Sequence, residues 1–352
     1  MKVIELDQSH EALWEDFVMG HKQSLVFHRA IWRRILSENF NIKPTYLLCI
    51  DRDRNVRAVL PLWFVDGFFF GRRMVSLPFH FFSGPLYTDR HALKEILLEA
   101  MKRSRNTRAR YLELKMRFAL DEKTVQDLSL RKRQHFIVSV LKLSPDPNTI
   151  WKRLDKGSVR WSVRKAEKND VKLHFASSED DLKDFYNLFV KNRKDLGVPP
   201  YSNNFFQEVW KYLWPKNMRI LLAKRHNIPV ATMLIFTHRR SVLYYWSACD
   251  RKHLQFQGTS FLIWKAIAWA CKNGYERFDF GLTSPAHAGL LSFKNKWNTV
   301  DISVPYYYYT VEGDQIAEFD YYTSFSFAKR MWRGLPLMVT RFLGPTLLKQ
   351  FA

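Results

Sequence analysis

The chain has 352 residues, a length that suits two domains better than one. Hydrophobic residues make up 47% of it, which excludes wholesale disorder. Its 56 lysine and arginine residues against 34 aspartate and glutamate residues leave a net charge of +22, and 16% of the residues are aromatic. A basic, aromatic-rich globular protein is expected to meet an anionic partner: a nucleic acid, a membrane surface or a phosphorylated substrate.

Cysteine spacing and hydropathy narrow the class of protein. Cys49, Cys249 and Cys271 are odd in number and far apart, so we expect neither a disulfide framework nor a metal site. The first residues lack the apolar core of a signal peptide, and no stretch of about 18 residues is apolar enough to span a bilayer. These features predict a cytoplasmic protein. No feature of the sequence indicates an oligomeric state.

The first half of the chain contains one run of predicted strands and one helix. Residues 93–101 have helical spacing, and strands are predicted at 46–50, 56–65, 74–77 and 111–114. Pro145 and Pro147 end this half and mark a domain boundary.

The second half repeats this order of elements. Strands are predicted at 219–223, 230–236, 241–248 and 276–280, with a helix at 260–272. Leu47 corresponds to Leu221, and Leu112 to Phe278, at nearly the same offset. We therefore predict a fold that combines α-helices with mixed β-sheets, which is α/β in the broad sense and of the α+β type. It consists of two copies of one unit that arose by internal duplication. The predicted domains are 1–146 and 147–325, followed by a basic tail at 326–352.

A basic segment opens the second half. Arg160, Arg164 and Lys168 recur at every fourth position, which places them on one face of a helix. Such a row binds phosphates, although a solvated surface produces the same pattern. Because the segment lies next to the predicted domain junction, where clefts form, we predict that these three residues contact the substrate.

The junction between the strand 241–248 and the helix 260–272 carries the predicted donor site. The first N–H groups of a helix have no partner within the helix and attract anions, and Gly258 allows the backbone to approach a phosphate closely. The spacing Gln255-x-x-Gly258-x-Ser260 resembles the pyrophosphate loop of GNAT acyltransferases, with serine where glycine or alanine is usual. An ordinary helix capped by Thr259 or Ser260 is the alternative.

We assign Gln255, Gly258, Thr259 and Ser260 to binding of an acyl-CoA-like donor, and Trp246 in the preceding strand to the same donor. At the equivalent place in the first half, Pro85 has no N–H group to offer. Only the second copy is therefore predicted to hold the donor, and the first copy is free to shape an acceptor groove.

The last strand of the core is followed by a loop with three candidate catalytic residues. Asp279 ends the strand, His287 lies among glycine and proline residues, and Lys294 comes next. Loops at strand ends often hold sites. His287 is the first candidate for a general base because histidine is the residue type suited to proton transfer near neutral pH, and Asp279 is the second. A histidine that serves only the core is the alternative reading of His287.

The C-terminal tail mixes basic and apolar residues. After Asp320 there is no acidic residue, and from Phe327 onward lysine and arginine alternate with tryptophan, phenylalanine, leucine and methionine. This composition predicts either a segment that docks on the protein's own core or a peripheral attachment to the anionic inner face of the cytoplasmic membrane.

Three motifs, by their order and spacing, resemble the FemAB-like, GNAT-related acyltransferases: Arg160-x-x-Val163-Arg164-Lys165-Ala166, Phe278-Asp-Phe-Gly281 and Phe293-Lys294-x-x-Trp297. More narrowly, the chain is similar to the FemAB-related proteins associated with exosortase (PEP-CTERM) exopolysaccharide systems, in residues 71–79 and 335–345 as well. It departs from the family at Asn298, where glycine is common, and lacks the inserted coiled-coil arm with which some members meet tRNA.

The resemblance implies tandem GNAT domains and transfer of an acyl group to an amine or hydroxyl of an envelope glycan or lipid-linked sugar. It implies that Lys294 assists the transfer and that its neighbour Phe293 contacts the substrate. Acyl-CoA is the implied co-substrate, with no permanently bound cofactor.

Three rival functions remain open. The first is an aminoacyl-tRNA-dependent transferase that modifies a peptidoglycan-type precursor. The second is a non-catalytic nucleic-acid-binding protein, which the charge favours, although no zinc-finger spacing or other nucleic-acid-binding signature is present. The third is a GNAT-like scaffold that only holds a biosynthetic complex at the membrane.

Overall fold

The computed structural model describes residues 1–68, 70–79, 82–310 and 326–351. The chain divides into two compact units that are not contiguous in sequence. Unit 1 comprises Met1–Phe136, Ser303–Phe319 and Leu348–Ala352, and unit 2 comprises Ile137–Ile302 and Asp320–Leu347. The predicted boundaries at 146 and 325 come from the repeated order of elements in the sequence, whereas the two units are defined by contacts between residues. The boundaries therefore stay a prediction.

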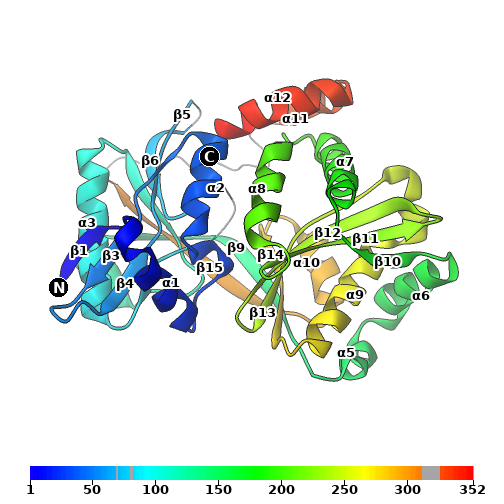
Figure 1. Ribbon diagram of the computed structural model, residues 1–352, viewed down its shortest axis with the longest axis horizontal. Coiled ribbons are helices and arrows are strands. Elements are labelled where there is room, and N and C mark those ends of the chain that lie inside the picture. The colour runs from blue at the N-terminus through cyan, green and yellow to red at the C-terminus, as the bar shows by residue number, and fades with distance from the viewer. Residues whose placement is uncertain (69, 80–81, 311–325, 352) are drawn as a thin grey trace. The chain divides into compact units, whose positions relative to one another are not determined.

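Unit 1 contains two groups of strands with helices packed on them (Figure 1). One group is the antiparallel sheet β1-β3-β4-β7, and the other has the order β15-β8-β6-β5-β2, in which β6 and β8 are parallel. The elements are β1 (Lys2–Glu5), η1 (Gln8–His10), α1 (Glu11–Gly20), η2 (Val26–His28), α2 (Ile31–Phe40), β2 (Lys43–Pro44), β3 (Leu47–Ile50), β4 (Val56–Leu60), β5 (Trp63–Gly67), β6 (Gly71–Val75), β7 (Leu86–Tyr87), α3 (Arg90–Asn106), β8 (Tyr111–Lys115) and α4 (Glu122–Asp127).

Two long strands run from one unit into the other along the chain. These are β9 (Arg131–Lys142) and β15 (Val300–Thr310). Within unit 1, residues Tyr306–Thr310 of β15 pair with β8.

The single strand predicted at 56–65 is two strands. β4 pairs with β3, whereas β5 pairs with β6 in the other group of strands. Pro61, between them, has no N–H group to continue the ladder, so the chain changes its pairing partner there. An apolar run shows that a segment is buried but not that it stays in one sheet.

Unit 2 is built on the six-stranded order β10-β11-β12-β13-β14-β9. Figure 1 shows α7 and α8 on one side of the strands and α5, α6 and α9 on the other. The remaining elements are α5 (Pro147–Arg153), η3 (Lys156–Arg160), α6 (Trp161–Lys168), β10 (Lys172–Phe175), α7 (Glu179–Leu196), α8 (Asn203–Leu213), β11 (Met218–Arg225), β12 (Ile228–His238), β13 (Ser241–Cys249), η4 (Arg251–Phe256), α9 (Gly258–Lys272), β14 (Arg277–Thr283), α10 (Ala288–Asn295), α11 (Ser326–Gly334) and α12 (Leu337–Lys349).

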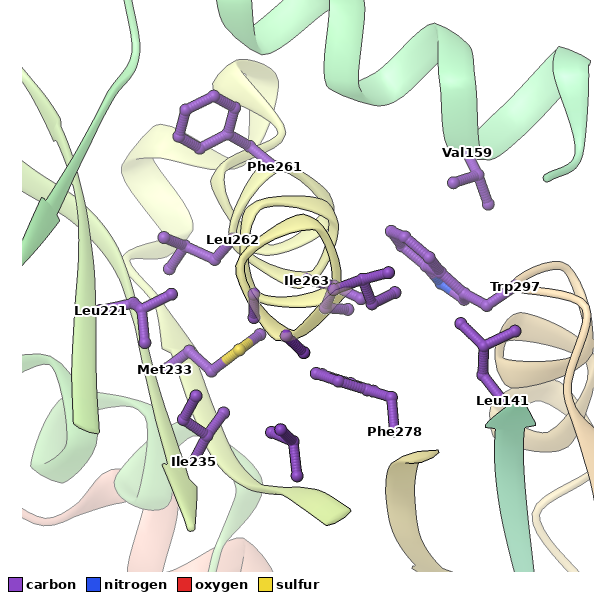
Figure 2. Packing of buried hydrophobic residues seen from close by; sticks show 14 of the residues in the cluster. Leu141, Val159, Leu221, Met233, Ile235, Phe261, Leu262, Ile263, Phe278 and Trp297 are labelled. Atoms are coloured by element: carbon purple, nitrogen blue, oxygen red, sulfur yellow. The ribbon is translucent and has the colours of Figure 1, made fainter. Parts of the chain in front are cut away.

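The helix α9 is apolar on nearly every side because it is covered on nearly every side. Figure 2 shows Leu262 directed toward Leu221 and Met233 of the sheet, while Ile263 faces Trp297. The helix ends at Lys272, and Gly274, with a φ of +74° that suits glycine, lies two residues beyond its end. A helix enclosed in this way is held by packing, so its N-terminus is a fixed point of unit 2.

The same order of elements recurs in the two units, and the predicted mixed α/β class is confirmed. In unit 1, α3 connects the parallel strands β6 and β8, and in unit 2, α9 connects the parallel strands β13 and β14. In the part of the chain that the structure describes, no helix combines the length and the apolar character needed to cross a membrane.

Candidate active site

The ladder between β13 and β14 is short. Over these strands, which the structure describes throughout, paired residues run only from Ser241 to Leu243 on β13, while β13 continues to Cys249 and β14 to Thr283. Gly281 marks the change: its φ is +72°, and a Cβ there would lie 3.3 Å from the carbonyl oxygen of Tyr244. A side chain at this position would therefore strain the backbone, which favours glycine.

Lys294 reaches the same point from α10. Its side chain is 4% exposed, and its Nζ donates to the carbonyl oxygen of Gly281 at 2.8 Å. The N–H of Gly281 in turn donates to Asp279 Oδ1 at 2.8 Å. Burial lowers the pKa of Lys294 from 10.5 to about 8, against the opposing pull of the carboxylates of Asp279 and Asp301. A buried ammonium with this pKa changes charge close to physiological pH.

The free energy of unfolding should depend on pH through Lys294. Its pKa in the folded protein lies below its value in the unfolded chain, so between pH 8 and 10.5 the unfolded chain binds more protons and stability rises with pH. Below pH 8 the burial of the charge costs about 3 kcal/mol. We expect Lys294→Met to be more stable than the wild type at pH 7, and this advantage to shrink by pH 10.5. Denaturant unfolding of both proteins across this range measures it; a difference that does not change with pH would contradict the assignment.

The N-terminus of α9 follows β13 through η4. Its N-cap is Gln257, with φ 56°, and no side chain forms a cap hydrogen bond. The predicted caps Thr259 and Ser260 lie instead in the first turn of the helix, where both are partly buried. The alternative of a helix capped by Thr259 or Ser260 is therefore wrong, and among the residues that the structure describes no side chain caps the first N–H groups of α9.

The absence of a side chain at Gly258 has a packing reason. A Cβ at this position would lie 2.8 Å from the Cβ of Ala231 in β12, closer than real Cβ atoms come. Gly258 is buried, whereas Gln255 is exposed in η4. The glycine lets α9 begin against the sheet, and any role toward a donor phosphate comes in addition to this one.

The corresponding helix of unit 1, α3, has a carboxylate bound at its N-terminus. Asp89 caps α3 by accepting from the N–H of Ala92 at 2.9 Å, and Arg57 donates to the same carboxylate at 2.9 Å. A helix end that already holds a carboxylate has less attraction for a second anion. The expectation that only the second copy holds the donor stays a prediction. The predicted loop of the first copy includes residues 80–81, which lie outside the described residues.

Trp246 belongs to an aromatic cluster on the side of the sheet covered by α7 and α8. Its ring centroid lies 4.9 Å from that of Tyr201 and 5.3 Å from that of Phe189. The indole is half-buried in this cluster. Its assigned contact with the donor stays a prediction.

The structure brings the basic segment to the end of α10. The N–H of Asp155, which caps η3, donates to the carbonyl oxygen of Lys296 at 3.2 Å, and Figure 2 shows Val159 facing Trp297. Arg160 is partly buried, and its Nε is buried with no hydrogen-bond partner among the described residues. A buried donor of this kind usually has a water or a ligand as its partner.

The other basic side chains point outward. Arg164 is exposed, with its guanidinium carbon 6.0 Å from the Trp151 ring, and Lys168 is exposed at the end of α6. Of the three predicted phosphate-binding residues, only Arg160 therefore has a buried donor next to the segment that carries Lys294.

The remaining candidates lie on α10 and its entrance. His287 is the partly exposed residue that precedes α10, two helical turns or about 10 Å from Lys294. Phe293 packs against Trp297, with ring centroids 6.3 Å apart, and joins the apolar core. Their assignment to the site stays a prediction. In the described part of the chain, no group of three or more potential ligands could hold a metal ion.

Sequence reasoning missed two contributors to the environment of Lys294. Gly281 supplies the carbonyl that holds the ammonium, and Asp301 on β15 adds a carboxylate that also accepts from Ser139 Oγ at 2.6 Å. The glycine that closes the Phe278–Gly281 motif was a visible signal of special backbone geometry. Asp301 had no such signal, because its approach depends on tertiary structure.

Comparison with known proteins identifies the fold. Residues 155–290 match the family model described as the acetyltransferase (GNAT) domain, a range that includes Gly258 and Asp279 and ends before Lys294. No curated protein matches the chain in sequence.

Several solved structures are similar over most of the chain. The crystal structure of FemX has a TM-score of 0.69 at 14% identity and covers 88% of this chain and 98% of its own. The C-terminal domain of a putative lysylphosphatidylglycerol synthetase from Agrobacterium fabrum has a TM-score of 0.58 at 10% identity, with coverages of 85% and 91%. A tandem GNAT protein from the clavulanic acid biosynthesis pathway has a TM-score of 0.54 at 8% identity, with coverages of 89% and 99%. The fold is thus that of the FemAB-like tandem GNAT proteins.

Proposed function

We propose that this chain, with its FemAB-like tandem GNAT fold, is an acyltransferase that moves an acyl group from an acyl-CoA-type donor to an amine or hydroxyl of a cell-envelope glycan or lipid-linked sugar. The match of residues 155–290 to the GNAT acetyltransferase domain supports the reaction class. The resemblance to exopolysaccharide-associated proteins supports the acceptor class. The observation that carries the proposal is the buried Lys294 ammonium at the end of the β13–β14 ladder.

The donor lies along the unpaired part of β13 in this proposal. Its phosphates meet the N–H groups at the start of α9, which no side chain caps. Backbone groups of β13 beyond Leu243, which are not used in the ladder with β14, are then available to the acyl group and its linker. Phe293 and the basic row led by Arg160 are assigned to the acceptor.

The acceptor nitrogen or oxygen attacks the carbonyl carbon of the thioester, and negative charge develops on the carbonyl oxygen. An ammonium has three N–H donors, and Gly281 takes one of those of Lys294. A second N–H donor of the Lys294 ammonium stabilises the negatively charged carbonyl oxygen, the oxyanion. The C–S bond then breaks, the new C–N or C–O bond remains, and the acceptor's proton replaces the acyl group on the departing sulfur, directly or through a base.

The two candidates for the general base, Asp279 and His287, are assigned different roles. Asp279 is 1% exposed and already accepts from the N–H of Gly281, so we assign it to positioning Gly281 and Lys294. We keep His287, which is partly exposed at the entrance of α10, as the candidate general base. If the acceptor is neutral before it attacks, no dedicated base is required.

The experiment that tests this proposal measures donor binding and product formation. Acetyl-CoA, a long-chain acyl-CoA and an aminoacyl-tRNA are compared by calorimetry with the purified chain, and each is then incubated with a lipid-linked glycan acceptor. We expect binding of an acyl-CoA and an acceptor whose mass rises by that of the acyl group less the hydrogen atom that it replaces. Failure of every acyl-CoA to bind would exclude the acyl-CoA version.

A second candidate keeps the fold and changes the donor. The resemblance to FemAB-like transferases and the charge of +22 favour an aminoacyl-tRNA donor, and the names of the similar structures include a lysylphosphatidylglycerol synthetase. Transfer of a radiolabelled amino acid that ribonuclease treatment abolishes would select this candidate. A chain that transfers neither group would be a non-catalytic scaffold.

A further inference from the structure

The last two helices combine a strong positive charge with large apolar side chains. Figure 1 shows α11 and α12, in red, next to α7. They contain no acidic residue and five basic ones: Lys329, Arg330, Arg333, Arg341 and Lys349. The sequence left two readings open for this segment, docking on the protein itself and attachment to a membrane.

The inner side of the two helices is docked within unit 2. Gly197, which ends α7, has a φ of +73°, and a Cβ there would lie 2.8 Å from the carbonyl oxygen of Lys329. A Cβ at Gly344 of α12 would lie 2.3 Å from Cδ of Pro200. Arg341 Nη2 donates to Asn187 Oδ1 on α7 at 2.5 Å. Docking is therefore close and specific on this side.

The opposite side of each helix carries exposed apolar side chains. On α11 these are Phe327 and Met331, which are 74% and 61% exposed, and on α12 they are Met338 and Phe342, 84% and 81% exposed. Each pair is spaced four residues apart, so its members share one helix face. On α12 the buried Thr340 and Gly344 lie on the opposite face. Exposed apolar pairs of this size mark a surface that meets another apolar phase.

The positive charge of α11 and α12 indicates which apolar phase their exposed side chains meet. Arg330 and Arg333 are exposed on α11, and the two helices offer no anion to balance them. Phenylalanine and methionine flanked by arginine and lysine are typical of helices that lie in the headgroup region of an anionic bilayer. We propose that the outer face of α11 and α12, formed by Phe327, Met331, Met338 and Phe342, is a docking surface for an anionic membrane. The two readings of the tail are then two faces of the same helices, and this inference does not depend on the proposed reaction.

Sedimentation of the full chain with vesicles tests the proposal. We expect binding to vesicles that contain phosphatidylglycerol, weaker binding to phosphatidylcholine alone, and a decrease with salt. Met338→Ser combined with Phe342→Ser should lower the partition coefficient by about tenfold or more. Arg330→Gln should lower it about fivefold on the anionic vesicles only. All these side chains are exposed, so thermal unfolding should be unchanged.

The matched control replaces exposed apolar residues elsewhere. Ile228→Ser combined with Leu98→Ser alters side chains on β12 and α3 that are also exposed, and we expect it to bind vesicles as the wild type does. Failure of the wild type to bind anionic vesicles would overturn the proposal. Equal binding by the Met338→Ser/Phe342→Ser variant would also overturn it. A dimer that this variant abolishes, in a chain that binds no vesicles, would assign the surface to a second copy instead.

Discussion

Lys294→Met should lower acyl-transfer turnover by about 10²- to 10³-fold, the loss expected when one preorganised oxyanion donor is removed. Methionine keeps the length and apolar bulk of the side chain in a site where Lys294 is almost fully buried, and it removes the ammonium that Gly281 holds. The measurement is kcat and KM with a saturating donor. We expect the loss in kcat, because the interaction is stronger in the transition state than in the ground state.

The control for this variant is Lys272→Met. Lys272 is an exposed lysine at the C-terminal end of α9, so its replacement removes one positive charge from unit 2 without touching the site. Turnover of the control should match that of the wild type. Equal turnover of Lys294→Met and wild type would remove Lys294 from the mechanism, and it would leave the scaffold function as the better account.

The pH profile separates two roles of Lys294. With a pKa of about 8, an ammonium that stabilises the oxyanion loses activity as the pH rises through 8, whereas an amine that acts as a base gains it. We expect the falling limb, and we expect it to be missing from the residual activity of Lys294→Met. A rising limb that depends on Lys294 would assign it as the base in place of His287.

Gly258→Ala should destabilise the protein by about 1–3 kcal/mol and weaken donor binding. The added methyl group would lie 2.8 Å from the Cβ of Ala231, on a strand of the central sheet that cannot easily move. The start of α9 must then shift away from the sheet, and its N–H groups shift with it. Denaturant unfolding measures the first effect, and calorimetry with acyl-CoA measures the second.

The matched experiment exchanges the two residues. Ala231→Gly combined with Gly258→Ala removes the clash while keeping one methyl group between α9 and β12. We expect the pair to recover most of the stability, with a coupling energy of about 0.5–3 kcal/mol. If stability returns and donor affinity does not, Gly258 also contacts the donor itself. A Gly258→Ala variant as stable as the wild type would contradict the packing argument.

The sequence by itself determined the strand–helix–strand order that both halves share and the position of α9, but not the helices α1, α2, α7 and α8. Periodic apolar residues specify which segments are buried and how long they are, and this is local information. The same pattern did not show that residues 56–65 divide between two groups of strands, because burial alone does not specify a pairing partner. Motifs selected Lys294 and Gly258 and assigned them to acyl transfer and to a donor phosphate, but they did not indicate the roles that burial gives Lys294 and that packing against β12 gives Gly258.

Only the tertiary structure decided those roles. The pKa of Lys294 depends on burial and on Asp279 and Asp301, and the need for glycine at 258 depends on Ala231. The two faces of α12 depend on Pro200 and α7 in the same way. Each of these effects acts over a few ångströms between residues that are distant along the chain. The contribution of a charge or a side chain to the free energy of the folded protein depends on such neighbours, and only the folded chain brings them together.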